Sequence, residues 1–543
     1  MSDLGEKHDV EGIESPRAPN LVDTKHIDGN IQLFDASGEG KARRVPIPSE
    51  SPRDPLNWSS QRKLGVIIAC CWFSIMSLAL VGNAGPLIPY WIQAYHPPPA
   101  NVSITAIINL TTWPSLFTGV GNYIFIPLCL WAGRRFSLLV ASIMCLIATI
   151  GAGASQNYEG HMTARVFQGL ASGVTESLLP LILTDITFVH RRGTIFAIYW
   201  TAQSILSSVF GISGPYIAAS SSWRGYYWVF TGTCAFGMIL NFFCIPESRF
   251  SRPPASIDGQ LVYTDAYGEQ ITLTEQEARE KGLTNASDID MRPLTFVETL
   301  KVWNGASKET ASLAVRSYWE MAKCLSAPGL LWAIAYSGIV LGVNIAFSLT
   351  YANNLIENYG WAPSQTGLIQ IATIPAGLLA TVYSGFGMDW LAMRSARKNG
   401  GVHTVESRLP IIVIPSIFVI IGTVCYGYTL ENPEMFGGHW IAPVAFFAMM
   451  VFGFISSLIT TTTFAVECCP RAPGPALVLG VGGKNLVAFG LSYGLVPLVM
   501  SDGGVYSYAT VLGTATAGAT ILAIPVYYFN PTWRKWASGK VVA

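Results

Sequence analysis

Charged side chains are scarce in this sequence of 543 residues. Only 12% of its residues are charged whereas 51% are hydrophobic, and the 33 basic residues balance the 33 acidic ones. A water-soluble domain carries roughly 25% charged residues, so an ordinary soluble protein is excluded. The zero net charge gives no argument for binding nucleic acid.

Recognisable catalytic and metal-binding patterns are also lacking. The ten cysteines stand alone or as neighbouring pairs beside or within apolar runs, and no spacing matches a metal site. We read them as small packing residues rather than a disulfide framework. The sequence shows no nucleophile elbow and no phosphate-binding loop, so we expect neither an enzyme nor a cofactor.

The sequence instead contains a series of apolar runs long enough to cross a bilayer. We identify twelve, at residues 64–90, 104–131, 136–154, 163–188, 194–219, 224–245, 329–355, 365–391, 409–429, 440–466, 473–500 and 506–529. Basic residues gather in alternate loops, which places both termini in the cytoplasm. We therefore expect an all-α membrane protein with twelve transmembrane helices.

A charged loop divides these runs into two halves of six. Residues 1–60 are polar and without apolar period, which predicts a disordered cytoplasmic tail. The first six runs occupy 61–246, the cytoplasmic loop 247–328, the last six runs 329–530, and a cytoplasmic tail 531–543. Within the loop, residues near 312–325 predict a short helix at the cytoplasmic surface.

The fourth run carries ionisable groups inside an apolar segment. Arg165, Gln168, Gly169, Ser172 and Glu176 recur at i, i+3, i+4, i+7 and i+11, which on a helix is one polar face. Arg165 and Glu176 would then lie roughly 16 Å apart along the axis. A low dielectric disfavours the charged carboxylate, so Glu176 is a candidate proton carrier. Arg165 would either tune the proton affinity of Glu176 or gate the outer side. The alternative is a structural carboxyl group bonded to neighbouring helices.

Further polar groups lie in other runs. Lys484 and Asn485 are deep in the eleventh run, and a lysine there needs a partner or water. Lys484 could face Glu176 across a cavity or face a substrate group, and a snorkelling lysine is the alternative. Additional candidates for substrate contact are Asn83, Asn344 and Tyr351.

Acidic residues close corresponding runs in the two halves, which is typical of an internal repeat. Asp185 ends the fourth run, Glu467 ends the tenth and Asp389 ends the eighth. We expect two of these acids to latch the cytoplasmic side with arginines: Asp185 with Arg134 or Arg135, and Glu467 with Arg394 or Arg397. The alternative is that these acids are solvated helix ends.

Two shorter signals complete the set. Gly211, Gly214 and Pro215 belong to a stripe of small residues in the fifth run, which predicts close helix packing with a weak point at the proline. Asn101 begins an Asn-Val-Ser sequon on the predicted outer side and is a candidate glycosylation site.

Several of these segments resemble motifs of the major facilitator superfamily, and within it the fungal twelve-span drug:proton antiporter branch. ARVFQGLASG resembles motif B, with Arg165 as its basic residue. GISGPYIAA is similar to the antiporter motif C, although Ala218-Ala219 replace the closing glycines and the leading glycine is displaced to Gly211. PLCLWAGRRFSLL resembles motif A with Leu130 in the place of its acid, and the second copy at Gly385–Arg394 keeps its acid as Asp389.

The resemblance, which covers roughly residues 50–535, implies two six-helix bundles that rock about a central site. It implies a monomer in the bilayer that exports a small organic compound, such as a drug, toxin or secondary metabolite, in exchange for protons. The plasma membrane is the expected location and the vacuolar membrane the alternative. Two other functions stay open: a proton symporter importing an organic nutrient such as a polyamine or carboxylate, and a solute sensor that transports nothing.

Overall fold

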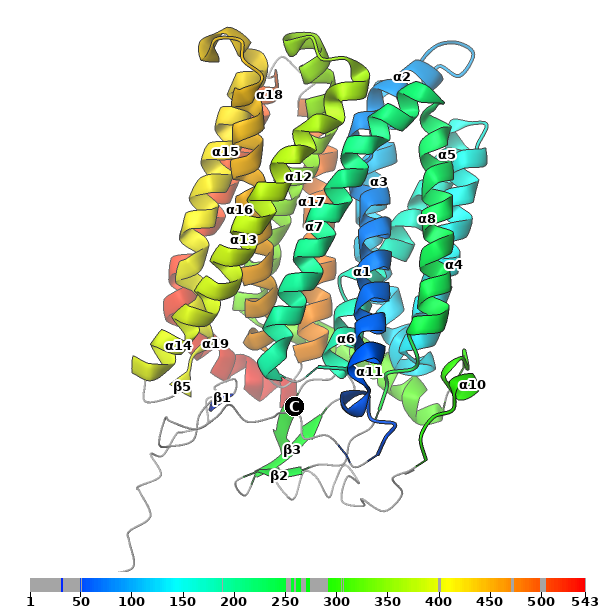
Figure 1. The fold of residues 1–543 in the computed structure, drawn as a ribbon. Coiled ribbons are helices and arrows are strands. Elements are labelled where there is room, and N and C mark those ends of the chain that lie inside the picture. Colours follow the sequence, from blue (N-terminus) through cyan, green and yellow to red (C-terminus); the bar gives the residue numbers. More distant parts are fainter. Residues whose placement is uncertain are drawn as a thin grey trace, which may run out of the picture.

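The described residues form a bundle of long helices. The computed structural model describes residues 31–32, 49, 51–187, 189–250, 255–257, 260–264, 270–273, 292–303, 305, 307–398, 402–469, 473–498 and 504–542. Among them, eleven helical segments are long and apolar enough to cross a membrane. The expected run at 194–219 is α7 (Val189–Ser220), which runs beside these segments in Figure 1.

The first half of the chain contributes one group of helices. Its elements are α1 (Ser60–Gly82), η2 (Gly85–Leu87), α2 (Ile88–Tyr95), α3 (Ile104–Ala132), α4 (Arg134–Ala154), α5 (Tyr158–Ser172), η3 (Gly173–Thr175), α6 (Leu178–Asp185), α7 and α8 (Trp223–Cys244). Helix α1 packs on α7 and α8, α3 on α5, and α4 on α5 and α8.

The second half repeats this arrangement. Its elements are α12 (Pro328–Tyr359), η4 (Pro363–Ala372), α13 (Thr373–Ala380), η5 (Thr381–Phe386), α14 (Gly387–Lys398), η6 (Val405–Ile412), α15 (Val413–Glu431), η7 (Pro433–Phe436), α16 (Ile441–Cys468), α17 (Pro473–Leu498), α18 (Gly504–Ile521) and α19 (Ala523–Val542). Helix α12 packs on α16 and α17, and α15 on α16 and α18.

Local signals in the sequence set where several helices begin and turn. Side chains of Ser103 and Asn157 accept hydrogen bonds from backbone N–H groups in the first turns of α3 and α5, as expected of N-caps. Gly133, between α3 and α4, has φ +103°, a conformation that favours glycine. Gly360 ends α12 in the left-handed conformation.

The two halves meet along two main seams, and η2 of the first half also packs on α12 of the second. In the first, which we call the α3–α17 seam, α3 lies against α17; in the second, the α7–η4 seam, α7 lies against η4 and α13. Glycines let the backbones approach closely: a Cβ atom on Gly367 would lie 2.5 Å from the carbonyl oxygen of Gly211. The seams place side chains of the first half directly against those of the second.

The described segments between α8 and α12 lie at one end of the bundle, which we call the inner end because the charge pattern predicts it to be cytoplasmic (Figure 1). A helix is present where the sequence predicted one near 312–325: it is α11 (Lys308–Cys324), preceded by α10 (Phe296–Thr299). The expectation of an all-α membrane protein is confirmed, and five short strands add to it: β1 (Ile31–Gln32) pairs with β5 (Val402–His403), while β2 (Ala255–Ile257), β3 (Gln260–Thr264) and β4 (Gln270–Leu273) form an antiparallel sheet. These strands lie outside the apolar segments.

Candidate functional site

The helix of the fourth run is broken beside Glu176. Helix α5 ends at Ser172, η3 forms one tight turn, and α6 begins at Leu178. Pro180 explains the break, because in a continuous helix its ring would clash with the carbonyl group of residue 176. The expectation of one continuous helical face from Arg165 to Glu176 is therefore corrected. The face ends at Ser172, and the side chain of Glu176 points in a direction of its own.

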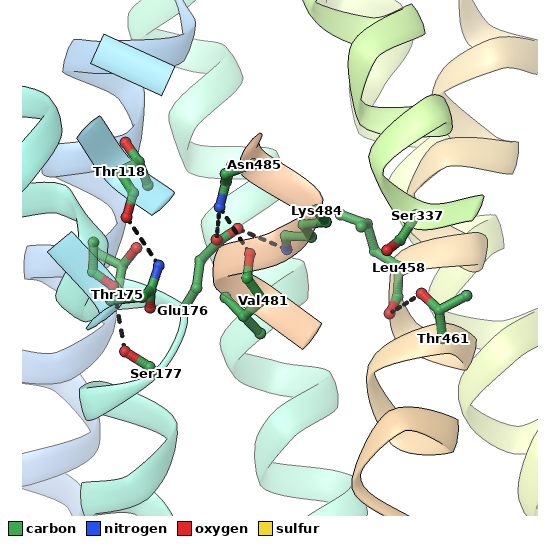
Figure 2. A network of polar contacts seen from close by, with 12 residues as sticks. Thr118, Thr175, Glu176, Ser177, Ser337, Leu458, Thr461, Val481, Lys484 and Asn485 are labelled. Atoms are coloured by element: carbon green, nitrogen blue, oxygen red, sulfur yellow. Dashed lines mark hydrogen bonds and ion pairs between the residues drawn. The ribbon is translucent and has the colours of Figure 1, made fainter. Parts of the chain in front are cut away.

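Glu176 points into the α3–α17 seam, where it contacts two side chains of α17 (Figure 2). Its Oε1 atom lies 2.9 Å from Nζ of Lys484, and its Oε2 atom accepts a hydrogen bond of 2.8 Å from Nδ2 of Asn485. The three residues are 8%, 3% and 5% exposed, respectively. The structure thus brings together, across the two halves, an acid and a base that the sequence places far apart.

Small residues on both helices make this contact geometrically feasible. A Cβ atom on Gly119 of α3 would lie 3.0 Å from both Cβ of Asn485 and the carbonyl oxygen of Gly482, and one on Gly482 would lie 2.6 Å from the ring of Tyr123. Larger residues at these positions would force α3 and α17 apart. Glu176 then could not reach Lys484.

The cavity that adjoins the site is small. A cavity beside Lys484, with Ser337 and Thr461 among its polar lining groups, has a volume of about 10 Å³. That is about the space one water molecule requires. An organic compound would need the halves to separate before it could occupy this position.

Arg165 lies elsewhere and does not reach Glu176. It is fully buried, and it donates hydrogen bonds to the carbonyl oxygens of Leu110, Leu80 and Val81 and to Oε1 of Gln168. These acceptors belong to α3, α1 and α5. Arg165 therefore ties three helices of the first half together, and its charge is solvated by backbone dipoles.

Two of the remaining substrate candidates, Asn83 and Tyr351, lie near the α7–η4 seam rather than beside Glu176. Asn83 caps α1 and donates a 2.5 Å hydrogen bond to the carbonyl oxygen of Ser207. Gly211 packs against Asn83 and Gln370, and the buried Tyr351 has Gln370 as its polar neighbour. Asn344 is partly buried on α12.

The other residues of the fifth run serve packing. Gly214 lies against the ring of Tyr226, where a Cβ atom would be 3.2 Å from Cε2. Helix α7 continues through Pro215 to Ser220, so the proline does not end it. The sequon residue Asn101 is exposed in the loop before α3.

One of the two expected latches has the expected partner. Nε of Arg134 lies 3.2 Å from Oδ2 of Asp185, and both side chains are almost fully buried. Arg135 instead donates to backbone carbonyl groups, among them that of Phe242 at 2.7 Å. Arg134 and Asp185 join the start of α4 to the end of α6.

The second latch has a different partner from the expected one. Glu467 pairs with Arg408 at 3.0 Å, so the choice of Arg394 or Arg397 is corrected. Arg394 lies over the ring of Trp390 at 5.1 Å and is exposed. The reason is position: Arg408 lies in η6, which packs on α16, whereas Arg394 lies in α14. The side chain of Asp389 falls outside the described residues.

Two acidic residues in the inner end were not singled out from the sequence. Glu247 follows α8, and its carboxylate accepts hydrogen bonds from the backbone N–H groups of Arg134 and Arg135. Its neighbour Ser248 donates to Asp185 at 2.8 Å. An acid at the start of α4 complements the helix dipole, so Glu247 stabilises the first turn of α4.

Glu406 is the second such acid. It is buried at the start of the ninth run and pairs with Arg534 at 2.9 Å, while Asn530 donates to it at 2.7 Å. The pair fastens α19 to η6. An acid and an arginine inside or beside apolar runs were the only sequence signals that could have revealed this contact.

Comparison with known proteins agrees with this architecture. The family model described as Major Facilitator Superfamily matches residues 67–474. An uncharacterised major-facilitator-type transporter of Schizosaccharomyces pombe is 24% identical, with 70% of each chain covered. The efflux pump radE of Floropilus chiversii is 20% identical, over 89% of this chain and 81% of its own.

Solved structures share the fold. A POT family transporter in complex with 5-aminolevulinic acid superposes with a TM-score of 0.60 and 14% identity, covering 87% of this chain and 96% of that one. The family model spans most of the chain, and the paired halves enclose a charged contact within the bilayer-length helices. The chain accordingly belongs to the major facilitator superfamily of membrane transporters.

Proposed function

We propose that this protein is a proton-coupled secondary transporter that exports a small organic compound by alternating access. The observation that carries the proposal is the buried contact of Glu176 with Lys484 and Asn485 across the α3–α17 seam. It joins the two halves at the place where a transporter of this architecture would have to open.

Protonation of Glu176 would loosen this contact. A buried ion pair persists because each charge compensates the desolvation of the other. When a proton binds one of the carboxylate oxygens, Glu176 becomes neutral and loses its attraction for Lys484. The halves can then part at this seam, and loss of the proton restores the closed pair. Proton binding and seam opening are thereby linked.

The opened seam would expose groups suited to an organic substrate. Lys484 and Asn485 offer N–H donors, and Asn83, Asn344 and Tyr351 would extend the polar lining toward the α7–η4 seam. Arg165 holds the surrounding helices in place. Export as the direction is supported by the resemblance to drug:proton antiporters and by the printed name of the efflux pump radE.

The remaining assignments belong to the same proposal. Residues 61–246 and 329–530 would be the two moving bundles, between the tails 1–60 and 531–543 and joined by the loop 247–328. Arg134, Arg135, Asp185, Asp389, Arg394 and Glu467 would form the cytoplasmic gate. The protein would act as a monomer in the plasma membrane, with Asn101 glycosylated outside.

Substitution of Glu176 tests the proton step. We expect Glu176→Gln to fold but to lose pH-driven transport, because an amide cannot accept and release the proton. Proteoliposomes with an imposed pH gradient would be assayed with ethidium and spermidine as probes. The exposed Glu159→Gln serves as the matched control and should transport normally. Normal pH-driven flux in Glu176→Gln would remove Glu176 from the mechanism.

Import by proton symport is the second candidate. The specific observation is the departure from antiporter motif C, in which Ala218-Ala219 stand where the glycines close the motif. The same proteoliposomes decide between the two. Accumulation of a probe on the side to which protons flow would establish symport, and accumulation on the opposite side would establish antiport.

A further inference from the structure

Helix α11 has three distinct sides. A helix that lies between protein and water needs only two, a buried side and a polar side. One side, with Ser317, Met321 and Cys324, is buried against the protein. A second side is polar, with Ser312, Arg316 and Glu320. The third is apolar and open: Val315, Tyr318 and Trp319 are 72%, 50% and 64% exposed. Such a side is unfavourable in water and suits the boundary of a bilayer.

The open side of α11 faces the inner end of the membrane helix α3. Ile124, Leu128 and Trp131 recur on α3 at helical spacing, and Ile124 and Trp131 are 45% and 38% exposed. Between the two helices lies a groove of about 360 Å³, whose other lining residues are Pro127, Ala311, Ala314, Val315 and Tyr318. The groove continues the outward-facing apolar surface of α3.

A hydrogen bond links the two walls. Pro127 has no N–H group, so the carbonyl of Tyr123, four residues earlier, lacks its helical donor. The hydroxyl group of Tyr318 donates to that carbonyl oxygen at 2.9 Å. The hydroxyl group of Tyr318 is therefore already engaged, and the surface that lines the groove is mostly apolar.

We propose that this groove between α3 and α11 binds an acyl chain of a phospholipid from the adjoining leaflet. The occupant follows from the surroundings: the groove opens on the lipid-facing side of a membrane helix, and the hydroxyl group of its tyrosine is engaged. Water there would face mostly apolar walls with few hydrogen-bonding partners. The chain would pack α11 against α3 directly beside Tyr123, whose ring also touches Gly482 in the α3–α17 seam.

Filling the groove with side chains tests the proposal. In the full-length protein purified in mild detergent, we expect native mass spectrometry to find a retained phospholipid. The Ala311→Phe/Ala314→Phe variant should lose about one phospholipid per protein, because its rings would occupy the groove. Ala322→Phe, on the exposed surface of the same helix and outside the groove, is the matched control and should retain the lipid.

Fluorescence gives an independent reading. In liposomes of phosphatidylcholine brominated in its acyl chains, the emission of Trp131, obtained by difference from Trp131→Phe, should be quenched. The filled variant should lose this quenching while the Ala322→Phe control keeps it. Equal lipid retention and equal quenching in all three proteins would overturn the proposal. If the filled variant does not fold, the native protein alone decides: absence of quenching of Trp131 in it would overturn the proposal.

Discussion

At the scale of single residues, the central fact is that two opposite charges are buried together between the halves. Glu176 and Lys484 are each almost inaccessible, and their side chains meet at 2.9 Å. Removing one partner from such a pair leaves the other buried charge without compensation, whereas removing both partners leaves no buried charge. The interaction energy of the pair can therefore be measured apart from the contribution of the packing around it.

A double-mutant cycle measures this coupling. We expect Lys484→Met to lower the free energy of unfolding by roughly 3–5 kcal/mol, because it strands the carboxylate. Adding Glu176→Gln should recover most of that loss. Denaturant unfolding in detergent provides the measurement, with the exposed Lys308→Met as control. Simple addition of the two single effects would show that the charges are not coupled.

At the scale of helices, the approach of α5 to α3 positions the segment that carries Glu176. A Cβ atom on Gly169 would lie 2.3 Å from the carbonyl oxygen of Pro114 and 2.7 Å from its Cα atom. Thr118 and Ser172 add a hydrogen bond of 2.9 Å between their hydroxyl groups. Backbone stands against backbone here, so no side chain can move aside for an added methyl group.

We therefore expect Gly169→Ala to destabilise the protein by about 1–3 kcal/mol through overpacking. Gly82→Ala, at the end of α1 with open space around it, should instead be neutral or stabilise by up to about 1 kcal/mol. Thermal unfolding of the two variants in the same detergent compares them directly. A Gly169→Ala protein as stable as the parent would mean that α3 and α5 can separate freely.

At the scale of the whole molecule, the two seams hold the halves in one relative position. Glu176 and Lys484 lie in one seam, and Thr201 of α7 meets Thr381 of the second half in the other, with 2.6 Å between the hydroxyl oxygens. Alternating access requires such contacts to break and form in each cycle. A covalent bond across a seam should then stop transport without affecting the fold.

The Thr201→Cys/Thr381→Cys variant provides that bond. Oxidation should form a disulfide and abolish probe transport in proteoliposomes, and reduction should restore it, because the halves can then move again. Each single-cysteine variant, oxidised in the same way, controls for the native thiols. Full transport by the cross-linked protein would show that this seam does not open.

Much of the architecture follows from local properties of the chain. Apolar length fixes where a segment can cross a bilayer, so the run expected at 104–131 is α3 and the run at 440–466 is α16. Where the expectations failed, a neighbour in sequence or space was decisive. Pro180 interrupts the helix, so Glu176 does not continue the polar face. The packing of η6 on α16 places Arg408, rather than Arg394 or Arg397, beside Glu467.

The sequence by itself determined that this is a membrane protein of many helices with rare ionisable groups inside them, because hydropathy and charge are properties of each segment alone. Only the tertiary structure decided which of those groups meet. Asn485 and Glu176 are 309 positions apart, and their contact depends on how closely α3 approaches α17. That distance is set by glycines on both helices acting together, and a pairing between two distant surfaces is not encoded in either segment alone.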